Sequence, residues 1–260
     1  AEGNGNRYSV TATTTQSGVV VSAIIDTGDE FIDKGTSTPE NITSSTQKTA
    51  SIVLTISTTA NYNVDLSKIT ITLSPFVPQY ISGFTFTTND NDMTATLTSY
   101  SGGASSVNIP SSISVLDGQF IVGSKYKVTT IGSDAFKYQS ILSVTIPEGV
   151  TVIESNAFYY INISSLELPS TLKTIGYGAF ASCFSLTSVT IPSNVTSIEA
   201  YAFSDCNRLT TITFENTYGW SIYSTSTATE GTAVDVTTPS QNATWLTSTT
   251  GYSNAYWKRS

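Results

Sequence analysis

The chain has 260 residues, of which 39% are hydrophobic and only 12% charged, with a formal net charge of −8 and no histidine. The missing histidine excludes Ser or Cys triads with a His base, and also His-ligated metal sites. With 11 basic residues against 19 acidic ones, the chain has no basic stripe for nucleic acid, and it is too apolar to be disordered.

Ser and Thr make up about a third of the residues, whereas Lys is sparse and Tyr abundant. This composition favours an exported bacterial protein, so we predict a secreted or cell-surface location. No segment approaches the ~18 consecutive apolar residues of a transmembrane helix. The chain opens at Ala1 without Met or an apolar signal segment, which we interpret as the start of a processed chain.

Residues 1–90 alternate apolar and polar side chains in short runs rich in β-branched residues, which predicts antiparallel strands. The expected strands are 8–14, 18–25, 50–58, 68–73 and 80–88. We predict an immunoglobulin-like β-sandwich, without the cysteines of antibody domains. Its boundary is expected at the polar junction Asn89–Asp92, so that domain two covers 91–260.

Two acidic clusters are candidate calcium ligands, because Ca²⁺ takes about 6–8 oxygen ligands. The residues are Asp26, Asp29, Glu30, Asp33, Asp90 and Asp92. Neither cluster follows the spacing of an EF-hand loop. A solvated acidic loop is the simpler interpretation, so calcium is a weak alternative and we expect no other cofactor.

From residue 131 onward, an Ala-Phe pair recurs at intervals of 22, 22 and 23 residues. Its phenylalanines are Phe136, Phe158, Phe180 and Phe203. An Ile precedes each pair, and an apolar-x-apolar-Pro segment such as VTIP at 144–147 follows the first three. The alternation predicts a short strand with one buried face, which Pro ends. One turn cannot bury this face alone, so the turns must stack into a mainly β solenoid.

The segment TIGYGAFASCFSLTSVTIPSNVTSI at 174–198 resembles the repeats of BspA-like (Treponema pallidum-type) leucine-rich-repeat bacterial surface proteins. Residues 97–113 resemble a degenerate first repeat, with Ile109-Pro110 at its strand end, and the last 19 residues resemble an aromatic cap. The resemblance implies a leucine-rich-repeat domain with an N-terminal cap at 91–130, repeats at 131–214 and a C-terminal cap at 215–260. We expect its cap to be packed by Trp220, Trp245, Tyr256 and Trp257.

Two surfaces are candidate binding sites. Outward side chains of the predicted strands form a hydroxyl-rich face made of Thr145, Glu167, Thr187, Ser188, Thr190, Thr211 and Thr213. A solenoid face of this kind suits a ligand, and simple solubility is the rival interpretation. On the return side, Tyr177 and Tyr201 are the candidate exposed aromatics, in a group that also includes Tyr138, Tyr159 and Tyr160. Exposed Tyr suits a protein or carbohydrate partner, although these rings could instead shield the Phe layer.

Cys183 and Cys206 occupy the same position in consecutive repeats, so stacking makes them neighbours. A disulfide is one possibility, but equivalent positions of a solenoid point the same way, which is poor geometry for a bridge. We favour two compact buried thiols. A catalytic Cys would lack a His base.

These patterns predict a non-enzymatic binding protein, a monomer whose partner is an extracellular protein or glycan. The resemblance implies adhesion to host proteins or to other bacteria. A structural spacer of the cell envelope is the alternative. A carbohydrate-active accessory domain or a hydrolase is a third hypothesis, and it would need two converging carboxylates that the sequence does not display.

Overall fold

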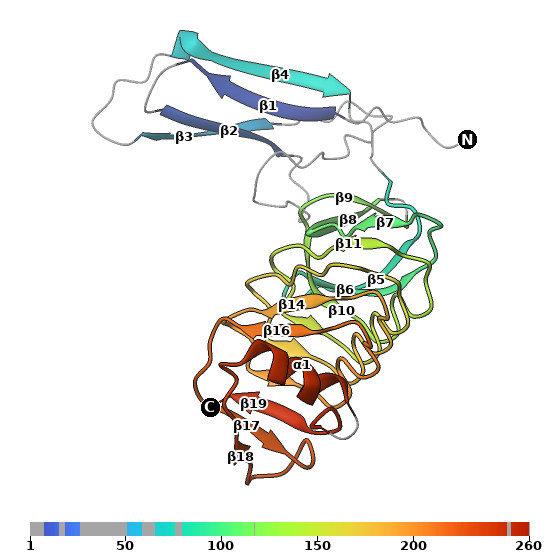
Figure 1. Ribbon diagram of the computed structural model, residues 1–260. Coiled ribbons are helices and arrows are strands. Elements are labelled where there is room, and N and C mark those ends of the chain that lie inside the picture. The colour runs from blue at the N-terminus through green and yellow to red at the C-terminus, as the bar shows by residue number, and fades with distance from the viewer. Residues whose placement is uncertain are drawn as a thin grey trace. The chain divides into compact units, whose positions relative to one another are not determined.

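The computed structural model describes residues 8–15, 19–26, 51–58, 66–75, 80–116, 118–248 and 251–259 (Figure 1). The chain divides into two compact units, which are described separately. The first consists of residues 1–80 with 121–125, and the second of residues 81–120 with 126–260. All four Ala-Phe turns lie in the second unit.

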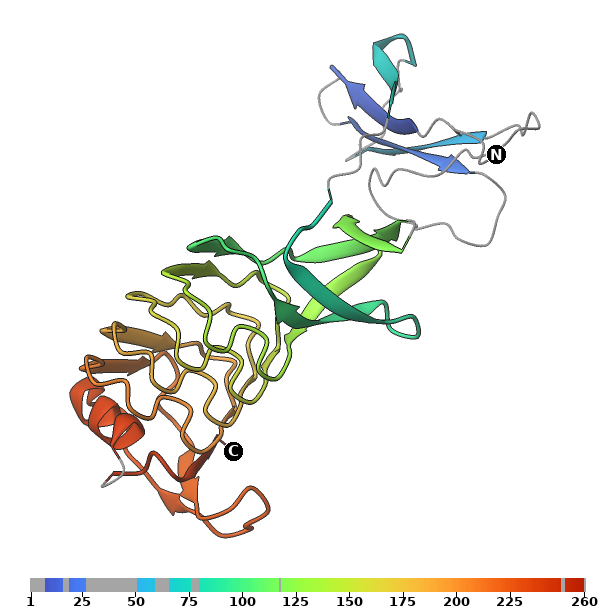
Figure 2. The same ribbon diagram turned by 90° about the vertical axis from the view of Figure 1, so that its right-hand side faces the viewer.

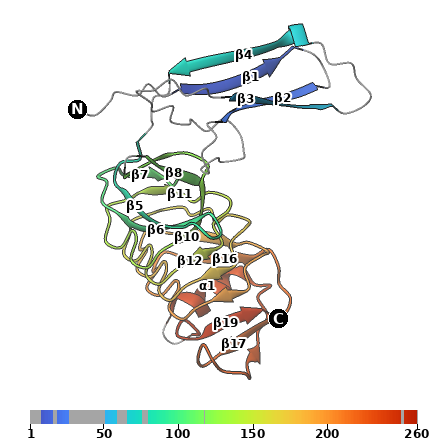
Figure 3. The same ribbon diagram turned by 180° about the vertical axis from the view of Figure 1, so that it is seen from behind.

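Two antiparallel strand pairs build the N-terminal unit (Figure 3). The paired strands are β1 (Tyr8–Thr14) with β4 (Ile69–Pro75), and β2 (Val19–Asp26) with β3 (Ser51–Thr58). A short 3-10 turn at Leu66–Lys68 leads into β4. Four of the strands expected from the alternation are therefore confirmed to within two residues, while the immunoglobulin-like topology stays a prediction.

The strand expected at 80–88 belongs to the repeat unit, not to the N-terminal module. This strand, β5 (Phe84–Asn89), pairs antiparallel with β6 (Thr94–Tyr100), so Asp90, Asn91, Asp92 and Met93 form a hairpin turn between them. The ring of Phe84 lies 4.9 Å from that of Tyr100. The expected boundary at 90 therefore differs from the structure, in which the second unit begins at Ile81.

Two ladders of strands run along the repeats. The first is a sheet of parallel neighbours whose strands are β6, β10 (Tyr126–Ile131), β12 (Val152–Ile153), β13 (Thr174–Ile175) and β15 (Ser197–Ile198). The second carries the apolar-x-apolar segments in parallel pairs, which are β7 (Ser106–Asn108) with β11 (Ser143–Thr145) and β14 (Ser188–Ile191) with β16 (Thr211–Phe214). A bridge between Leu166 and Val189 joins the intervening turn to β14. Figure 2 shows the turns stacked one upon the next.

The N-terminal cap supplies a first rung to each ladder. In the first ladder Leu97 of β6 pairs with Ile131, and in the second Val107 of β7 pairs with Val144. The remaining strands of the cap are β8 (Ser112–Leu116), which pairs antiparallel with β10, and β9 (Gln119–Val122), which pairs with β8. The degenerate first repeat expected around Ile109 is thus confirmed.

The four phenylalanines form one stack through the core, and we number the turns 1 to 4 by them. Neighbouring ring centroids lie 4.9, 5.2 and 5.4 Å apart and the rings are parallel to within 12°. All four side chains are fully buried. Each Phe N–H of turns 1 to 3 donates to the Ala carbonyl of the next turn, as Phe158 does to Ala179 at 2.8 Å. The predicted solenoid register is therefore confirmed.

Two positions in every turn have left-handed backbone geometry, two residues before and two residues after the Phe. They are Asp134, Asn156, Gly178 and Tyr201 before it, and Tyr138, Tyr160, Ser182 and Asp205 after it, with φ between 54° and 62°. These reversals bring the Phe inward on a tight loop. Asn, Asp and Gly tolerate this conformation, whereas a bulky residue adopts it only with steric strain in the backbone.

Glutamates tie neighbouring turns together. Glu154 accepts hydrogen bonds from the N–H and hydroxyl of Ser133, both at 3.0 Å. Glu148 accepts them from the N–H groups of Ser170 at 2.8 Å and Thr171 at 3.2 Å. The Ser170 N–H, followed by the Ser170 hydroxyl, lowers the pKa of Glu148. The same arrangement joins Glu199 to Tyr177 and Glu215 to Ser193.

The C-terminal cap closes the first ladder with antiparallel strands. Its strands are β19 (Tyr256–Arg259), which pairs with β15, then β17 (Trp220–Tyr223) and β18 (Thr232–Ala233). The helix α1 (Pro239–Thr247) packs beside β16, and its buried Asn242 donates to the carbonyls of Ile212 and Val236, both at 2.9 Å. Among the described residues, no helix is long and apolar enough to cross a membrane.

Aromatic rings fill this cap as expected. Trp257 is fully buried, and its ring lies 6.4 Å from Phe214 and 6.2 Å from Trp245. Trp220 is also buried, 5.0 Å from Phe214. The last turn is thus covered by tryptophan instead of by another repeat.

Candidate binding surfaces

The seven predicted strand residues lie together on the second ladder, and we call them the strand face. Thr145, Glu167, Thr190 and Thr213 form an exposed outward row across the four turns. Their neighbours along the strands, such as Val189 and Ile212, are buried in the core. The alternation expected from the sequence therefore holds at this face.

Ser188 and Thr211 pair across β14 and β16 at the margin of the strand face. Thr187 and Ser188 are exposed and Thr211 is half-buried. The Thr187 carbonyl accepts a hydrogen bond from the Thr210 N–H at 3.1 Å, which ties turns 3 and 4 together beneath the hydroxyls. Because Thr is β-branched, the side chains of Thr187 and Thr211 have few χ1 rotamers available.

Tyr177 and Tyr201 come together as a pair on the return side. Their ring centroids lie 5.3 Å apart at 65°, and Tyr177 is exposed whereas Tyr201 is half-buried. Tyr201 has φ 62°, and the backbone N–H of Tyr177 donates to Glu199 at 3.1 Å. The pair is positioned as expected, and its role in binding stays a prediction.

A larger group of rings crosses turns 1 to 3, and we call it the exposed aromatic cluster: Tyr138, Tyr159, Tyr160 and Phe184. The Tyr160 ring lies 5.7 Å from Tyr138 and 5.3 Å from Phe184, while Tyr138 lies 5.4 Å from Tyr159. Tyr138 is 63% exposed and Tyr160 is 52% exposed. Sequence reasoning placed the three tyrosines on this side but missed Phe184, which lies four residues after the core Phe of turn 3.

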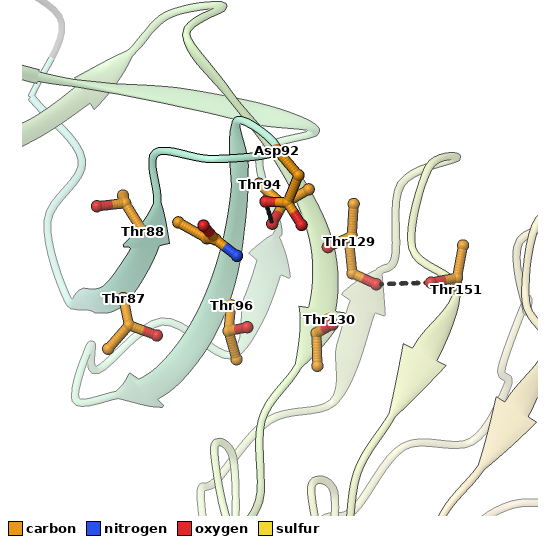
Figure 4. A pocket seen from close by; sticks show the side chains of 9 residues that line it. Thr87, Thr88, Asp92, Thr94, Thr96, Thr129, Thr130 and Thr151 are labelled. Atoms are coloured by element: carbon orange, nitrogen blue, oxygen red, sulfur yellow. Dashed lines mark hydrogen bonds between the residues drawn. The ribbon is translucent and has the colours of Figure 1, made fainter.

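A polar hollow of about 460 Å³ opens near the start of the first ladder (Figure 4). It is lined by Thr87, Thr88, Asn89, Asp92, Thr94, Thr96, Thr129, Thr130 and Thr151. The Thr151 hydroxyl donates to the Thr129 carbonyl at 3.3 Å. The hollow offers hydroxyl and carboxyl groups but no ring. Sequence reasoning missed it, because threonine is too common in this chain to mark a site.

Two of the acidic residues proposed as calcium ligands, Asp90 and Asp92, take part in hydrogen bonds with neighbouring hydroxyl groups. Asp90 accepts a hydrogen bond from the Tyr126 hydroxyl, and Asp92 accepts one from the Thr94 hydroxyl at 2.8 Å. Asp26 ends β2, and the others lie outside the described residues: Asp29, Glu30 and Asp33. Within the described part of the chain, no three His, Cys, Asp or Glu side chains gather as a metal site. Calcium binding stays a prediction.

Cys183 and Cys206 are free and buried in consecutive turns. Each thiol donates to the Phe carbonyl of the preceding turn, Cys183 to Phe158 at 3.4 Å and Cys206 to Phe180 at 3.1 Å. The neighbouring Cys183 thiol, together with burial, raises the pKa of the Cys206 thiol. The interpretation as compact buried thiols is confirmed, and a protonated thiol is a poor nucleophile.

Parallel strands stacked at intervals of 22 or 23 residues, one apolar rung per turn and a cap at each end, define a leucine-rich-repeat solenoid. The family model of the BspA type leucine-rich repeat region matches residues 129–242 in six copies. The chain belongs to this family. The match continues past residue 214, where the sequence analysis ended the repeats, and reaches α1.

Several solved structures are similar to this chain. A leucine-rich repeat protein from Bacteroides capillosus is 34% identical over 54% of this chain and 99% of its own, with a TM-score of 0.45. The T. pallidum leucine-rich repeat protein is 22% identical over 52% of this chain and 70% of its own, with a TM-score of 0.39. A leucine-rich cell surface protein from Faecalibacterium prausnitzii is 20% identical over 64% of this chain and 62% of its own, with a TM-score of 0.27. No curated protein matches the chain.

Proposed function

We propose that this chain is a non-catalytic binding protein, secreted or displayed on a bacterial cell surface, that attaches to an extracellular protein through its strand face. The observation that carries the proposal is the exposed row of Thr145, Glu167, Thr190 and Thr213 on a ladder of buried neighbours. The Ser- and Thr-rich, Lys-poor composition supports a location outside the cytosol.

The chemistry of this face suits recognition better than catalysis. Hydroxyl groups donate and accept hydrogen bonds, and small side chains let a partner approach the backbone closely. Glu167 is the single titratable group among the seven residues, so the face has no pair of acids for general acid–base catalysis. With a net charge of −8, the chain attracts a basic partner surface, and Glu167 can select a Lys or Arg on it.

A binding screen of the full chain against immobilised matrix proteins and bacterial surface proteins tests the proposal. We expect saturable binding to at least one of them. The variants Glu167→Lys and Thr190→Lys should weaken this binding by about tenfold or more. Thr232→Lys is the matched control, because Thr232 is exposed on β18 of the cap, away from the second ladder.

Binding that Glu167→Lys and Thr190→Lys leave unchanged would remove the site from the strand face. No binding to any protein of the panel would overturn the adhesion role and favour a spacer of the cell envelope. The screen is repeated with a chelator, and binding lost on chelation would show that it depends on a divalent cation and would favour the acidic clusters as its ligands.

A further inference from the structure

Two tyrosines of the exposed aromatic cluster have a backbone conformation that bulky residues rarely adopt. Tyr138 and Tyr160 occupy the left-handed position after the core Phe, with φ 61° and 58°. In turns 3 and 4 the same position is filled by Ser182 and Asp205, whose short side chains suit such a reversal far better than a ring does. A bulky side chain in this conformation is strained, and strain of this kind gathers at functional sites.

Burial in the core does not offset this strain, because the Tyr138 and Tyr160 rings are 63% and 52% exposed. The solenoid gains little packing from holding them there. The cluster continues to Phe184, which is 40% exposed and lies one turn further along. A contiguous exposed aromatic patch marks a place of interaction.

The rings meet at steep angles instead of lying flat. The ring planes of Tyr138 and Tyr159 are 84° apart, and those of Tyr160 and Phe184 are 89° apart. Each such corner sets the face of one ring beside the edge of another. A ligand in the corner can rest on a ring face while it reaches a phenolic hydroxyl at the side.

The surroundings of the cluster are polar and uncharged overall. The Lys137 ammonium lies 5.6 Å from the Tyr138 ring centroid, and it is paired with Asp134 at 2.9 Å, so its charge is cancelled locally. Beside the rings, the Ser185 hydroxyl donates to the Asn162 amide oxygen. Asn162 holds the position in turn 2 that Phe184 holds in turn 3, which puts an amide next to the rings.

We propose that the exposed aromatic cluster binds a neutral saccharide chain. Sugar C–H groups carry partial positive charge and pack on the negative face of an aromatic ring, while sugar hydroxyls bond to phenol and amide groups. A neutral ligand matches a site at which the Lys137 ammonium is already paired with Asp134. This site is separate from the strand face, and it does not depend on the function proposed for that face.

Titration of the full chain with neutral oligosaccharides tests the proposal, using the hexaoses of cellulose, xylan, mannan and chitin at up to millimolar concentration. We expect at least one to bind. The double variant Tyr138→Asn with Tyr160→Asn removes two rings and places Asn, which tolerates left-handed backbone, at both positions. It should lower the affinity about tenfold or more without lowering the melting temperature.

The matched control is Asp205→Asn, which makes the same residue at the equivalent position of turn 4, where φ is 58°. It should bind saccharide as the wild type does. No binding to any oligosaccharide, or equal binding by the double variant, would overturn the proposal. If the double variant instead loses a protein ligand while no saccharide binds, the cluster is a protein-docking surface. Glu167→Lys should leave saccharide binding intact, which separates this site from the strand face.

Discussion

Phe180 illustrates how the stability of the solenoid depends on single core side chains. Its ring lies 5.2 Å from Phe158 and 5.4 Å from Phe203, and it is fully buried. The hydrogen-bonded turns above and below cannot close around a missing ring. We therefore expect Phe180→Ala to lower the free energy of unfolding by about 3–5 kcal/mol, measured by denaturant titration.

Phe184 supplies the matched control for this prediction, because it is the same residue type in the same turn but 40% exposed. Phe184→Ala should change the free energy of unfolding by less than about 1 kcal/mol. If Phe180→Ala cost no more than that, the stack of phenylalanines would not be the element that holds the turns in register.

The two thiols lead to a second prediction at the residue scale. Cys183 and Cys206 are buried, and the neighbouring Cys183 thiol and the loss of solvent raise the pKa of Cys206. A raised pKa keeps the thiol protonated, and only the thiolate reacts with disulfide reagents. The native chain should therefore release almost no thionitrobenzoate from Ellman's reagent at pH 8, and two equivalents after unfolding. Rapid labelling of the native chain would contradict the buried position.

At the scale of elements, the glutamates that join turns predict a loss of stability in acid. Hydrogen bonds from Ser170 lower the folded-state pKa of Glu148 below its ordinary value of 4.5. Their stabilising effect is therefore fully present above about pH 4.5 and is lost as the pH falls through the folded-state pKa. The denaturant midpoint of the wild type should drop more steeply between pH 7 and pH 3 than that of Glu148→Gln.

An exposed carboxyl in the cap supplies the control for this measurement. For Glu230→Gln, the denaturant midpoint should fall with pH in parallel with that of the wild type, since Glu230 is exposed outside the stacked turns. A Glu148→Gln profile that also ran parallel would show that the bond to Ser170 contributes nothing to acid lability.

The elements differ in how far the sequence could predict them. Ala-Phe and Pro at a fixed period encode local geometry, so the Phe stack and the strands that end at Pro were predictable. The strand β5 was assigned to the wrong unit, because its alternation is the same whichever core its phenylalanines face. The polar run at 89–92 suits the start of a hairpin turn as well as it suits a domain linker.

The candidate surfaces were predicted in part for a similar reason. Period-two alternation is enough to place Thr190 and Thr213 outward. The left-handed backbone of Tyr138 and Tyr160 was not predictable, because tyrosine is a residue that such positions disfavour. Tyr138 and Tyr160 occupy the position, two residues after the core Phe, that Ser182 and Asp205 occupy in turns 3 and 4. This equivalence can be read from the sequence, but the positive φ at the position comes from the structure alone.

At the scale of the whole repeat unit, stability depends on covering both ends of the stack. A solenoid turn contacts only its neighbours, so a bare terminal turn exposes its core and its strand edge. At the N-terminal end, Tyr100 lies 5.3 Å from Phe136. At the C-terminal end, β19 pairs with the last rung at Ile198, and Trp257 fills the space behind it.

Trp257 is therefore the residue on which closure of the C-terminal end of the solenoid depends. Trp257→Ala should lower the free energy of unfolding by about 3–5 kcal/mol, because the ring is fully buried against Phe214 and Trp245. Loosening of β19 would also uncover the edge of β15, a template for pairing with a second chain. Size-exclusion chromatography with light scattering should show a monomer for the wild type and concentration-dependent oligomers for the variant.

Tyr218→Ala, at a ring that is 84% exposed in the same cap, should remain monomeric and stable. A Trp257→Ala chain that stayed monomeric while losing stability would show that α1 and β17 cover the last turn without β19.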